Sequence, residues 1–450
     1  MSALPLQLAN SSSWRSRPRH DARWWNRPWL VAAFLVAVFF LANHNYHASS
    51  LWRETTSHDV NLMVSRISQG ELTRQAAFLS LSAVGTLGVL TPARRRFRVD
   101  ALILYPLTLL VAWCALSVLW SHAPTLTAKR LVVFYAIASA VVATVKHFGP
   151  GILVPIAFLY GSASLALGVA AEALLRTNPL AGDYRFAGTT HPNHTGLAMV
   201  LLALSSLALA DWRDRRRRWF FVVAAVAGCA LVLTGSRTAL FAGVASAGLM
   251  TVVRWPLRRL LLVGIPGLWV VLLTFTLYSL DLVPPIWQKA LLSREDSDVR
   301  TLTGRTEIWA FALHQLAHNE ERVLIGFGYD SFWTPEMALA VSRFVQFKIS
   351  EGHSAYIDAT LETGVIGAGL FIFLLLAAQY RWCVYAWRSK SAAAAFAAAM
   401  PALAIVHGFA ESAFIDPHLW TYLLFAAMGF AALARPSSSA LKPALGGLQR

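Results

Sequence analysis

Long apolar runs alternate with short polar connections along most of this chain. Many of the runs are roughly 15 to 25 residues long, the length that an α-helix needs to cross the hydrocarbon core of a bilayer. The pattern therefore predicts an all-α, polytopic membrane helix bundle of about 12 transmembrane helices. The expected spans are 28–42, 72–90, 99–119, 131–145, 152–174, 195–210, 219–234, 238–253, 260–280, 361–379, 391–410 and 419–434.

The polar connections divide the chain into five regions. We expect a cytoplasmic N-terminal tail at 1–27, with the first apolar run retained as a span, and transmembrane helices 1 to 9 within 28–280. A large periplasmic loop follows at 281–360, then helices 10 to 12 at 361–434 and a cytoplasmic C-terminal tail at 435–450. Within the large loop, "GRTEIWAFALHQL" has apolar residues at helical spacing, which predicts a short amphipathic helix.

Composition agrees with this pattern, since 56% of the 450 residues are hydrophobic and only 14% are charged. The net charge of +16 is explained by where the basic residues lie along the chain. The dense basic connections "ARRRFR", "DWRDRRRR", "RWPLRR" and "RWCVYAWRSK" all fall on one face of the predicted bundle, together with both tails. The positive-inside rule makes that face cytoplasmic, so the excess indicates contact with anionic lipid and not with nucleic acid.

Four polar motifs lie at the opposite, outer ends of the predicted helices. They are "YRFAGTTHPNHTG" with Arg185 and Asn193, "TGSRTAL" with Arg237, "TGRTEIW" with Arg305, and "EGHSAYIDATLETG" with His353. Arginine grips phosphate oxygens through paired donors, and helix N-termini favour anions. The three arginines could thus converge on one diphosphate, although snorkelling or an ordinary ion pair remains the alternative for each.

Histidine titrates near neutral pH and can take a proton from an attacking hydroxyl, so His353 is a candidate general base. The alternative is a hydrogen-bonded histidine at a helix end. Its spacing places His353, Tyr356 and Thr360 on one helical face, with Glu362 on the other face as a structural residue. His191 and His194 supply too few ligands for zinc, and "GFGYD" lacks the third glycine of a dinucleotide site.

The motifs resemble the bacterial O-antigen ligase and O-antigen or exopolysaccharide polymerase superfamily, multispanning glycosyltransferases of the inner membrane. The residues concerned are "RFAGTTHPNHTG", "GSRTAL", "GRTEIWAFAL", "LIGFGYDSFW" and "GHSAYIDATLETGVIGAGLF", in that order. The resemblance implies a GT-C-like fold and transfer of glycan from undecaprenyl diphosphate without a metal or other cofactor. It carries over Arg237, Arg305 and His353 as catalytic residues, and Arg185 less tightly.

Two further residues, Tyr356 and Asn193, are expected to contact the diphosphate or the glycan. The family often has His-Asn followed by an aromatic residue, whereas Ser354 follows the histidine here. No role is therefore carried over to that position.

The leading hypothesis is polymerisation of lipid-linked repeat units at the periplasmic face. One alternative is ligation of the glycan to lipid A-core, and another is a polysaccharide-lipid transporter or flippase. Acidic residues are scarce within the runs, which counts against ion-coupled transport. The expected partners are the undecaprenyl-diphosphate-linked glycan, its glycan or lipid A-core acceptor, the bilayer and other membrane proteins of polysaccharide assembly.

Overall fold

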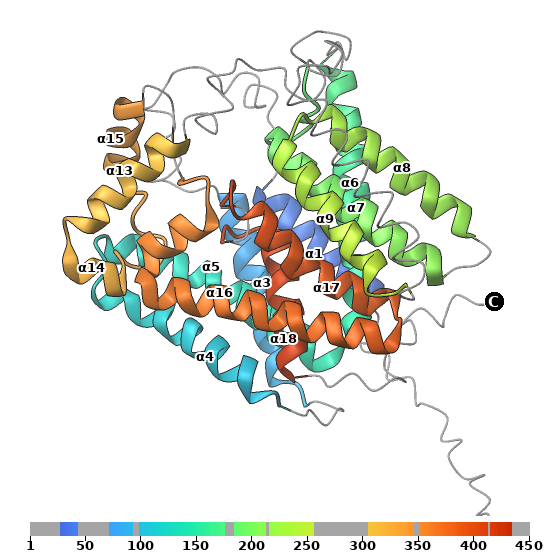
Figure 1. The fold of residues 1–450 in the computed structure, drawn as a ribbon, viewed down its shortest axis with the longest axis horizontal. Helices are drawn as coiled ribbons and strands as arrows, with labels where there is room; N and C mark the ends of the chain where they lie inside the picture. Colours follow the sequence, from blue (N-terminus) through green and yellow to red (C-terminus); the bar gives the residue numbers. More distant parts are fainter. Residues whose placement is uncertain are drawn as a thin grey trace, which may run out of the picture.

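The computed structural model describes residues 28–43, 72–92, 99–175, 184–212, 216–255, 305–345, 349, 351–412 and 415–433. Within these residues every regular element is helical (Figure 1). The bundle helices are α1 (Pro28–Asn43), α3 (Leu72–Leu90), α4 (Ala101–Leu116), α5 (Pro124–His147), α6 (Leu153–Leu174), α7 (Pro192–Trp212), α8 (Arg217–Leu233), α9 (Arg237–Val252), α16 (Ala355–Ser389), α17 (Ala392–His407) and α18 (Leu419–Leu433). Three shorter helices, α13 (Arg305–Ala317), α14 (Glu320–Ile325) and α15 (Pro335–Val345), lie together to one side of the bundle (Figure 1).

Helices occupy the predicted apolar runs wherever the structure describes them. Five are long and apolar enough to cross a membrane: Ala101–Leu119, Pro124–His147, Pro150–Leu174, Pro192–Asp211 and Ala355–Ser389. The shorter apolar helices are α1, α9, α17 and α18. The expected span 260–280, both tails and residues 281–304 of the large loop lie outside the described residues. The amphipathic helix predicted from "GRTEIWAFALHQL" corresponds to α13.

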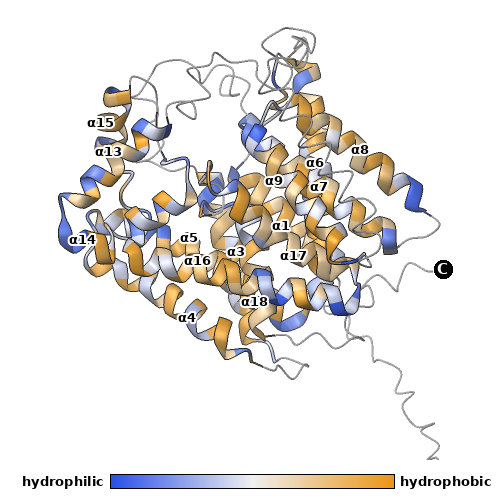
Figure 2. Ribbon diagram, viewed as in Figure 1, coloured by the Kyte–Doolittle hydropathy of each residue, from blue (hydrophilic) through white to orange (hydrophobic). Residues whose placement is uncertain are grey.

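Hydrophobic residues cover most of the bundle, as Figure 2 shows. In its interior, α17 carries an alanine run, Ala392 to Ala399 interrupted only by Phe396, whose side chains are all buried. Small side chains allow helix backbones to approach closely, and α17 packs against α9 and α16. Large apolar side chains such as Leu102 and Tyr105 of α4 are instead exposed, as expected of a surface that faces lipid.

The helix α16 is interrupted at Gly364, whose φ of 67° lies in the left-handed region. The interruption leaves backbone carbonyls without partners in the next turn. Phe327 N–H donates to the Leu361 carbonyl at 2.8 Å, Gly328 N–H to the Glu362 carbonyl at 2.9 Å, and the Trp113 indole N–H to the Thr363 carbonyl at 2.9 Å. The segment "GFG" thus completes the backbone hydrogen bonding of a broken helix.

Gly326 and Gly364 are required because the backbones of residues 324–326 and 362–364 approach each other closely. A Cβ on Gly326, whose φ is 74°, would lie 2.4 Å from the Glu362 carbonyl oxygen. A Cβ on Gly364 would lie 2.1 Å from the Leu324 carbonyl oxygen. The G-x-G spacing that superficially suggested a nucleotide loop therefore has a structural cause in this chain.

The same segment is also held by the connection between α4 and α5. The Trp120 indole N–H donates to the Ile325 carbonyl at 3.1 Å, and the Thr127 hydroxyl donates to the Tyr329 carbonyl at 3.1 Å. Arg130 of α5 forms an ion pair with Asp330. These bonds fix the α13–α15 region on the helix bundle.

Ion pairs at the helix ends opposite the polar motifs involve residues of the predicted basic face. Arg254, just after α9, pairs with Asp211 of α7, and Arg381 of α16 pairs with Asp100 before α4. The ammonium group of Lys390 lies 3.8 Å from the centre of the Trp387 ring. The polar motifs, in contrast, lie at the other ends of the same helices.

Candidate active site

Four of the six predicted site residues meet around a carboxylate that the sequence analysis did not single out. Glu411 follows α17 and is buried, with 4% of its side chain exposed. Its Oε1 accepts hydrogen bonds from Arg305 Nη2 and Asn193 Nδ2, both at 2.6 Å. Its Oε2 lies 3.5 Å from His353 Nδ1. We call the group Arg185, Asn193, Arg305, Glu351, His353 and Glu411 the Glu411 cluster.

Arg185 joins the cluster through Asn193. Its Nη2 donates to Asn193 Oδ1 at 3.1 Å, and its Nε donates to the Thr234 carbonyl at 2.8 Å. Thr234 ends α8, and the next residue, Gly235, has a φ of 63°. A Cβ on Gly235 would lie 3.2 Å from Arg185 Nε, so the tight turn between α8 and α9 makes room for this guanidinium.

His353 lies just before α16, with a φ of 50° that is unusual for a residue with a side chain. The predicted shared helical face of His353, Tyr356 and Thr360 is therefore wrong, because the helix begins only at Ala355. His353 Nδ1 lies 3.2 Å from Glu351 Oε1 in addition to its contact with Glu411. Within the described part of the chain no hydrogen bond engages Nε2, and 28% of the side chain is exposed. Nε2 is thus the ring nitrogen that a substrate can reach.

The backbone around His353 is fixed by Asp358 of α16, which is 1% exposed. Asp358 Oδ1 accepts from the Gly352 N–H at 3.0 Å and from the Trp333 indole at 2.8 Å, and Oδ2 accepts from the Ser412 hydroxyl. Gly352 precedes His353 and Ser412 follows Glu411. One carboxylate therefore connects the two loops that carry the histidine and its partner.

Gly352 also ties the cluster to α13, because its carbonyl accepts from the Trp309 indole at 2.8 Å. Trp309 lies one turn after Arg305 on that helix. A Cβ on Gly352 would lie 2.4 Å from Asp358 Oδ1, so a larger residue would displace this carboxylate.

The loop carboxylates of the cluster differ in protonation. Burial alone would raise the pKa of Glu411, but its interactions with His353 and the charge of Arg305 lower it to about 2. Burial, followed by the nearby charges of Glu411 and Asp358, raises the pKa of Glu351 to about 8. Burial, helped by His194, lowers the pKa of His191 to about 4. At neutral pH, Glu411 is therefore the charged carboxylate beside His353.

One group of potential metal ligands involves the same residues. Single ligand atoms of Glu351, His353 and Glu411 lie within 4.8 Å of one another. Glu411 Oε1 is, however, already occupied by the guanidinium of Arg305 and the amide of Asn193. The carboxylate of Glu411 is thus bound by the cationic side chain of Arg305 at the position where a metal ion could lie. That the reaction requires no metal stays a prediction.

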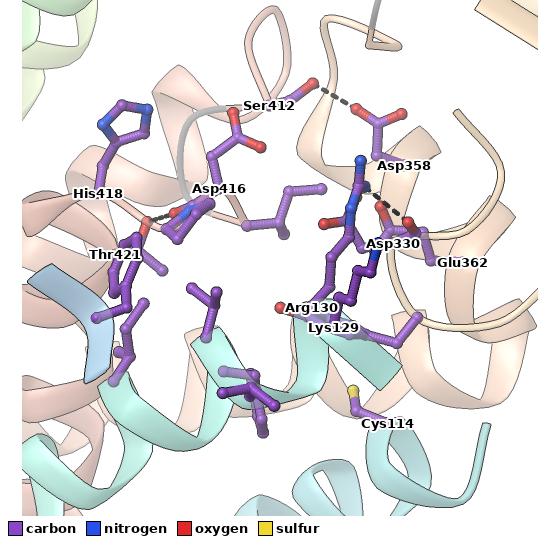
Figure 3. A pocket seen from close by; sticks show the side chains of 18 of the residues that line it. Cys114, Lys129, Arg130, Asp330, Asp358, Glu362, Ser412, Asp416, His418 and Thr421 are labelled. Atoms are coloured by element: carbon purple, nitrogen blue, oxygen red, sulfur yellow. Dashed lines mark hydrogen bonds and ion pairs between the residues drawn. The ribbon is translucent and has the colours of Figure 1, made fainter. Parts of the chain in front are cut away.

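A cavity of about 910 Å³ adjoins the cluster, and Glu351 lines it. Its polar wall includes Lys129 and Arg130 of α5, Asp330, and Glu362 of α16. Figure 3 shows the Arg130 side chain beside Asp330 and Glu362, with Asp358 and Ser412 nearby and Asp416 across the cavity. The apolar wall is formed by residues of several bundle helices, namely Phe78, Leu79, Leu110, Val111, Val132, Val133, Ile137, Phe371 and Phe425.

This cavity was not foreseen from the sequence. Arg130 immediately precedes the expected span at 131–145, so the predicted helix does not include it. The structure places it two turns inside α5. Glu362, interpreted as structural, lines the cavity as well. A charge within an apolar run was the signal that could have revealed both residues.

Arg237 and Tyr356 lie apart from the hydrogen bonds of the cluster. Arg237 is the first residue of α9, after the N-cap Ser236, and it forms no hydrogen bond or ion pair with the residues that the structure describes. The Tyr356 hydroxyl donates to the Ile405 carbonyl at 2.9 Å, and its ring packs on Phe409. Their roles in substrate binding or catalysis stay predictions.

Comparisons with known proteins agree with the resemblance read from the motifs. Residues 222–372 match the family model described as O-antigen ligase. The chain is also 28% identical over 138 residues to the exopolysaccharide production protein ExoQ of Rhizobium meliloti (strain 1021). That alignment covers 29% of this chain and spans only 31% of the length of the relative. The matched family segment contains Arg237, Arg305 and His353.

The matches and the apolar helices together indicate a membrane protein similar to the O-antigen ligase and polymerase superfamily over residues 222–372.

Proposed function

We propose that this protein is an inner-membrane glycosyltransferase that polymerises glycan repeat units carried on undecaprenyl diphosphate. The observation that supports the proposal most is the position of His353 beside Glu351, which lines the cavity. Nδ1 faces two carboxyl groups, of which Glu411 is the charged one, while Nε2 has no partner among the described residues. A histidine held in this way is suited to accept a proton at Nε2.

The two walls of the cavity suit a lipid-linked donor. The isoprenoid chain would lie against the apolar wall, and the diphosphate and first sugars would lie where the cavity meets the Glu411 cluster, at Glu351. Arg237, which has no partner in the described part of the chain, and the more tightly bonded Arg305 and Arg185 would stabilise the diphosphate, with Asn193 and Tyr356 near the glycan. Guanidinium groups can do so without a metal, because they remain charged and form paired hydrogen bonds to phosphate oxygens.

In the proposed reaction the acceptor hydroxyl attacks the anomeric carbon of the donor. A bond forms between the acceptor oxygen and that carbon, while the bond from the carbon to the phosphate oxygen breaks. The electron pair of the broken bond leaves with undecaprenyl diphosphate, and the hydroxyl proton passes to His353 Nε2. Stabilising the developing negative charge of the leaving group is the largest contribution required of the protein.

We assign the Glu411 cluster to the periplasmic side. The described ion pairs of Arg254 and Arg381 lie at the remote helix ends, which the positive-inside rule assigns to the cytoplasm. Cytoplasmic termini follow from the same orientation and remain predictions, because both tails lie outside the described residues.

Ligation to lipid A-core is the second candidate, favoured by the description of the matching family model. The two activities use the same donor and differ in the acceptor. Deleting the gene and analysing the glycans separates them. Single repeat units on the acceptor indicate a lost polymerase, whereas full-length chains left on the lipid carrier indicate a lost ligase.

The purified protein in liposomes, supplied with lipid-linked glycan, tests transfer itself. Release of undecaprenyl diphosphate with elongation or transfer of the glycan is expected. Movement of the lipid across the bilayer without bond cleavage would indicate a transporter and contradict the proposal. The broken helix α16 makes this control necessary, since interrupted helices also line substrate sites in transporters.

A further inference from the structure

We propose that Glu411 is the positioning residue of the reaction: it holds His353 in the tautomer with Nδ1 protonated, which leaves the lone pair of Nε2 to accept the proton of the acceptor hydroxyl. This inference rests on the proposed glycan transfer. It assigns a role to a residue outside every motif that the sequence analysis used.

The geometry limits which ring nitrogen can act. Nδ1 lies 3.5 Å from Glu411 Oε2 and 3.2 Å from Glu351 Oε1, so both carboxyl groups approach the same atom. Nδ1 is buried and neither contact has hydrogen-bond geometry, so the negative charge of Glu411 at 3.5 Å, and not a formed hydrogen bond, favours a proton on Nδ1. After proton transfer the imidazolium ion lies beside a negative charge.

Glu411 suits this role better than Glu351. It is 4% exposed, compared with 28% for Glu351, and Arg305 and Asn193 hold its other oxygen. The low pKa of Glu411, about 2, keeps it charged, whereas burial raises the pKa of Glu351 to about 8. The other titratable or charged groups that interact with Glu411 or His353 are Asp358, His191, His194, His407 and Arg305.

The two loops that carry His353 and Glu411 are held by hydrogen bonds that do not involve the Glu411 side chain. Asp358 binds the neighbours Gly352 and Ser412, and the Ala355 N–H donates to the Gly408 carbonyl at 2.9 Å. A Glu411→Gln substitution keeps the size of the side chain and removes its charge. It therefore tests the carboxylate without removing the scaffold.

The kinetic test compares Glu411→Gln with the wild type in the full-length protein. We expect kcat for transfer to fall about 100-fold because general-base catalysis is impaired, and the donor KM to change far less, because the glutamine oxygen can still accept from Arg305 and Asn193. In a His353→Ala background the same substitution should cause no further loss, since Glu411 acts through His353. Glu307→Gln, an exposed acid on α13, is the matched control and should keep wild-type kinetics.

A wild-type kcat in Glu411→Gln, or an equal additional loss in the His353→Ala background, would overturn the assignment. Should Glu411→Gln fail to fold, Glu411→Asp provides the second test. It keeps the charge and should retain more of kcat than Glu411→Ala.

A nitrogen NMR spectrum of histidine-labelled protein tests the tautomer without any substrate, with the His353 signal identified by its loss in His353→Ala. We expect Nδ1 to be protonated at neutral pH in the wild type and the tautomers to mix in Glu411→Gln. The expected tautomer in a protein that transfers no glycan would contradict the proposed function alone. Active transfer with the proton on Nε2 in the resting protein would contradict this inference alone.

Discussion

The Glu411 cluster and the polar wall of the cavity are neighbours built in different ways. The cluster is assembled from residues at helix ends and in loops, such as Arg305, His353 and Glu411. The polar wall takes Arg130 and Glu362 from within α5 and α16. The difference shows that the motif residues Arg305 and His353 could be picked out from the sequence, whereas Glu411, Arg130 and Glu362 were recognised only from the packing of distant segments.

The largest effect should come from His353→Ala. We expect transfer to fall about 1,000-fold, because the proton acceptor is lost. Membrane insertion and thermal unfolding should match the wild type, since the described hydrogen bonds of the neighbouring backbone do not involve the imidazole. Wild-type transfer rates would exclude His353 as the base and remove the functional importance of the cluster.

Gly364→Ala should mainly affect the cavity wall. A Cβ would lie 2.1 Å from the Leu324 carbonyl oxygen at a positive φ, so α16 and the end of α14 must separate. The expected cost is about 1–3 kcal/mol of unfolding free energy, measured as a lower melting temperature in detergent. Gly369→Ala, on the same helix with open space around its Cα, is the control. Equal melting temperatures for the two variants would show that the close approach is unimportant.

Arg130→Gln sharpens the comparison between the two regions. It removes the ion pair with Asp330 and the cation beside Glu362, so we expect donor KM to rise about tenfold, the effect of losing one charge-assisted hydrogen bond. Arg343→Ala, an exposed arginine of α15, is the control. A fall in kcat at constant KM would instead place Arg130 with the catalytic group.

Arg237→Lys should reduce kcat/KM about fivefold to tenfold while leaving stability unchanged. Lysine keeps the charge but loses the forked donor geometry that suits phosphate. Because Arg237 has no partner among the described residues, the loss would reflect substrate contact. Unchanged kinetics in a steady-state assay would remove Arg237 from the diphosphate site.

The smallest effect is expected from chelation. EDTA should leave transfer unchanged, because Arg305 and Asn193 already occupy one oxygen of Glu411. Loss of activity with EDTA and recovery with a divalent cation would show that Glu351, His353 and Glu411 bind a metal.

The sequence predicted the positions of the described bundle helices well, because apolar runs of this length have few alternatives in a membrane. It placed the start of α16 six residues too late, since the polar residues before Leu361, among them Asp358 and Thr360, make its first turn look like a loop. Four site residues found through motifs do contact one another through Glu411 or Asn193. Glu411 itself is a single acid in "HGFAES", and only tertiary packing reveals that it faces Arg305 and His353.

The interruption of α16 also bears on how the protein is assembled. Three carbonyl groups of this helix depend on Phe327, Gly328 and Trp113, and an unpaired carbonyl inside a bilayer costs several kcal/mol. All three donors precede α16 in the chain and leave the ribosome before it. When α16 is synthesised, the donors that its interrupted turn requires are therefore already present in the chain.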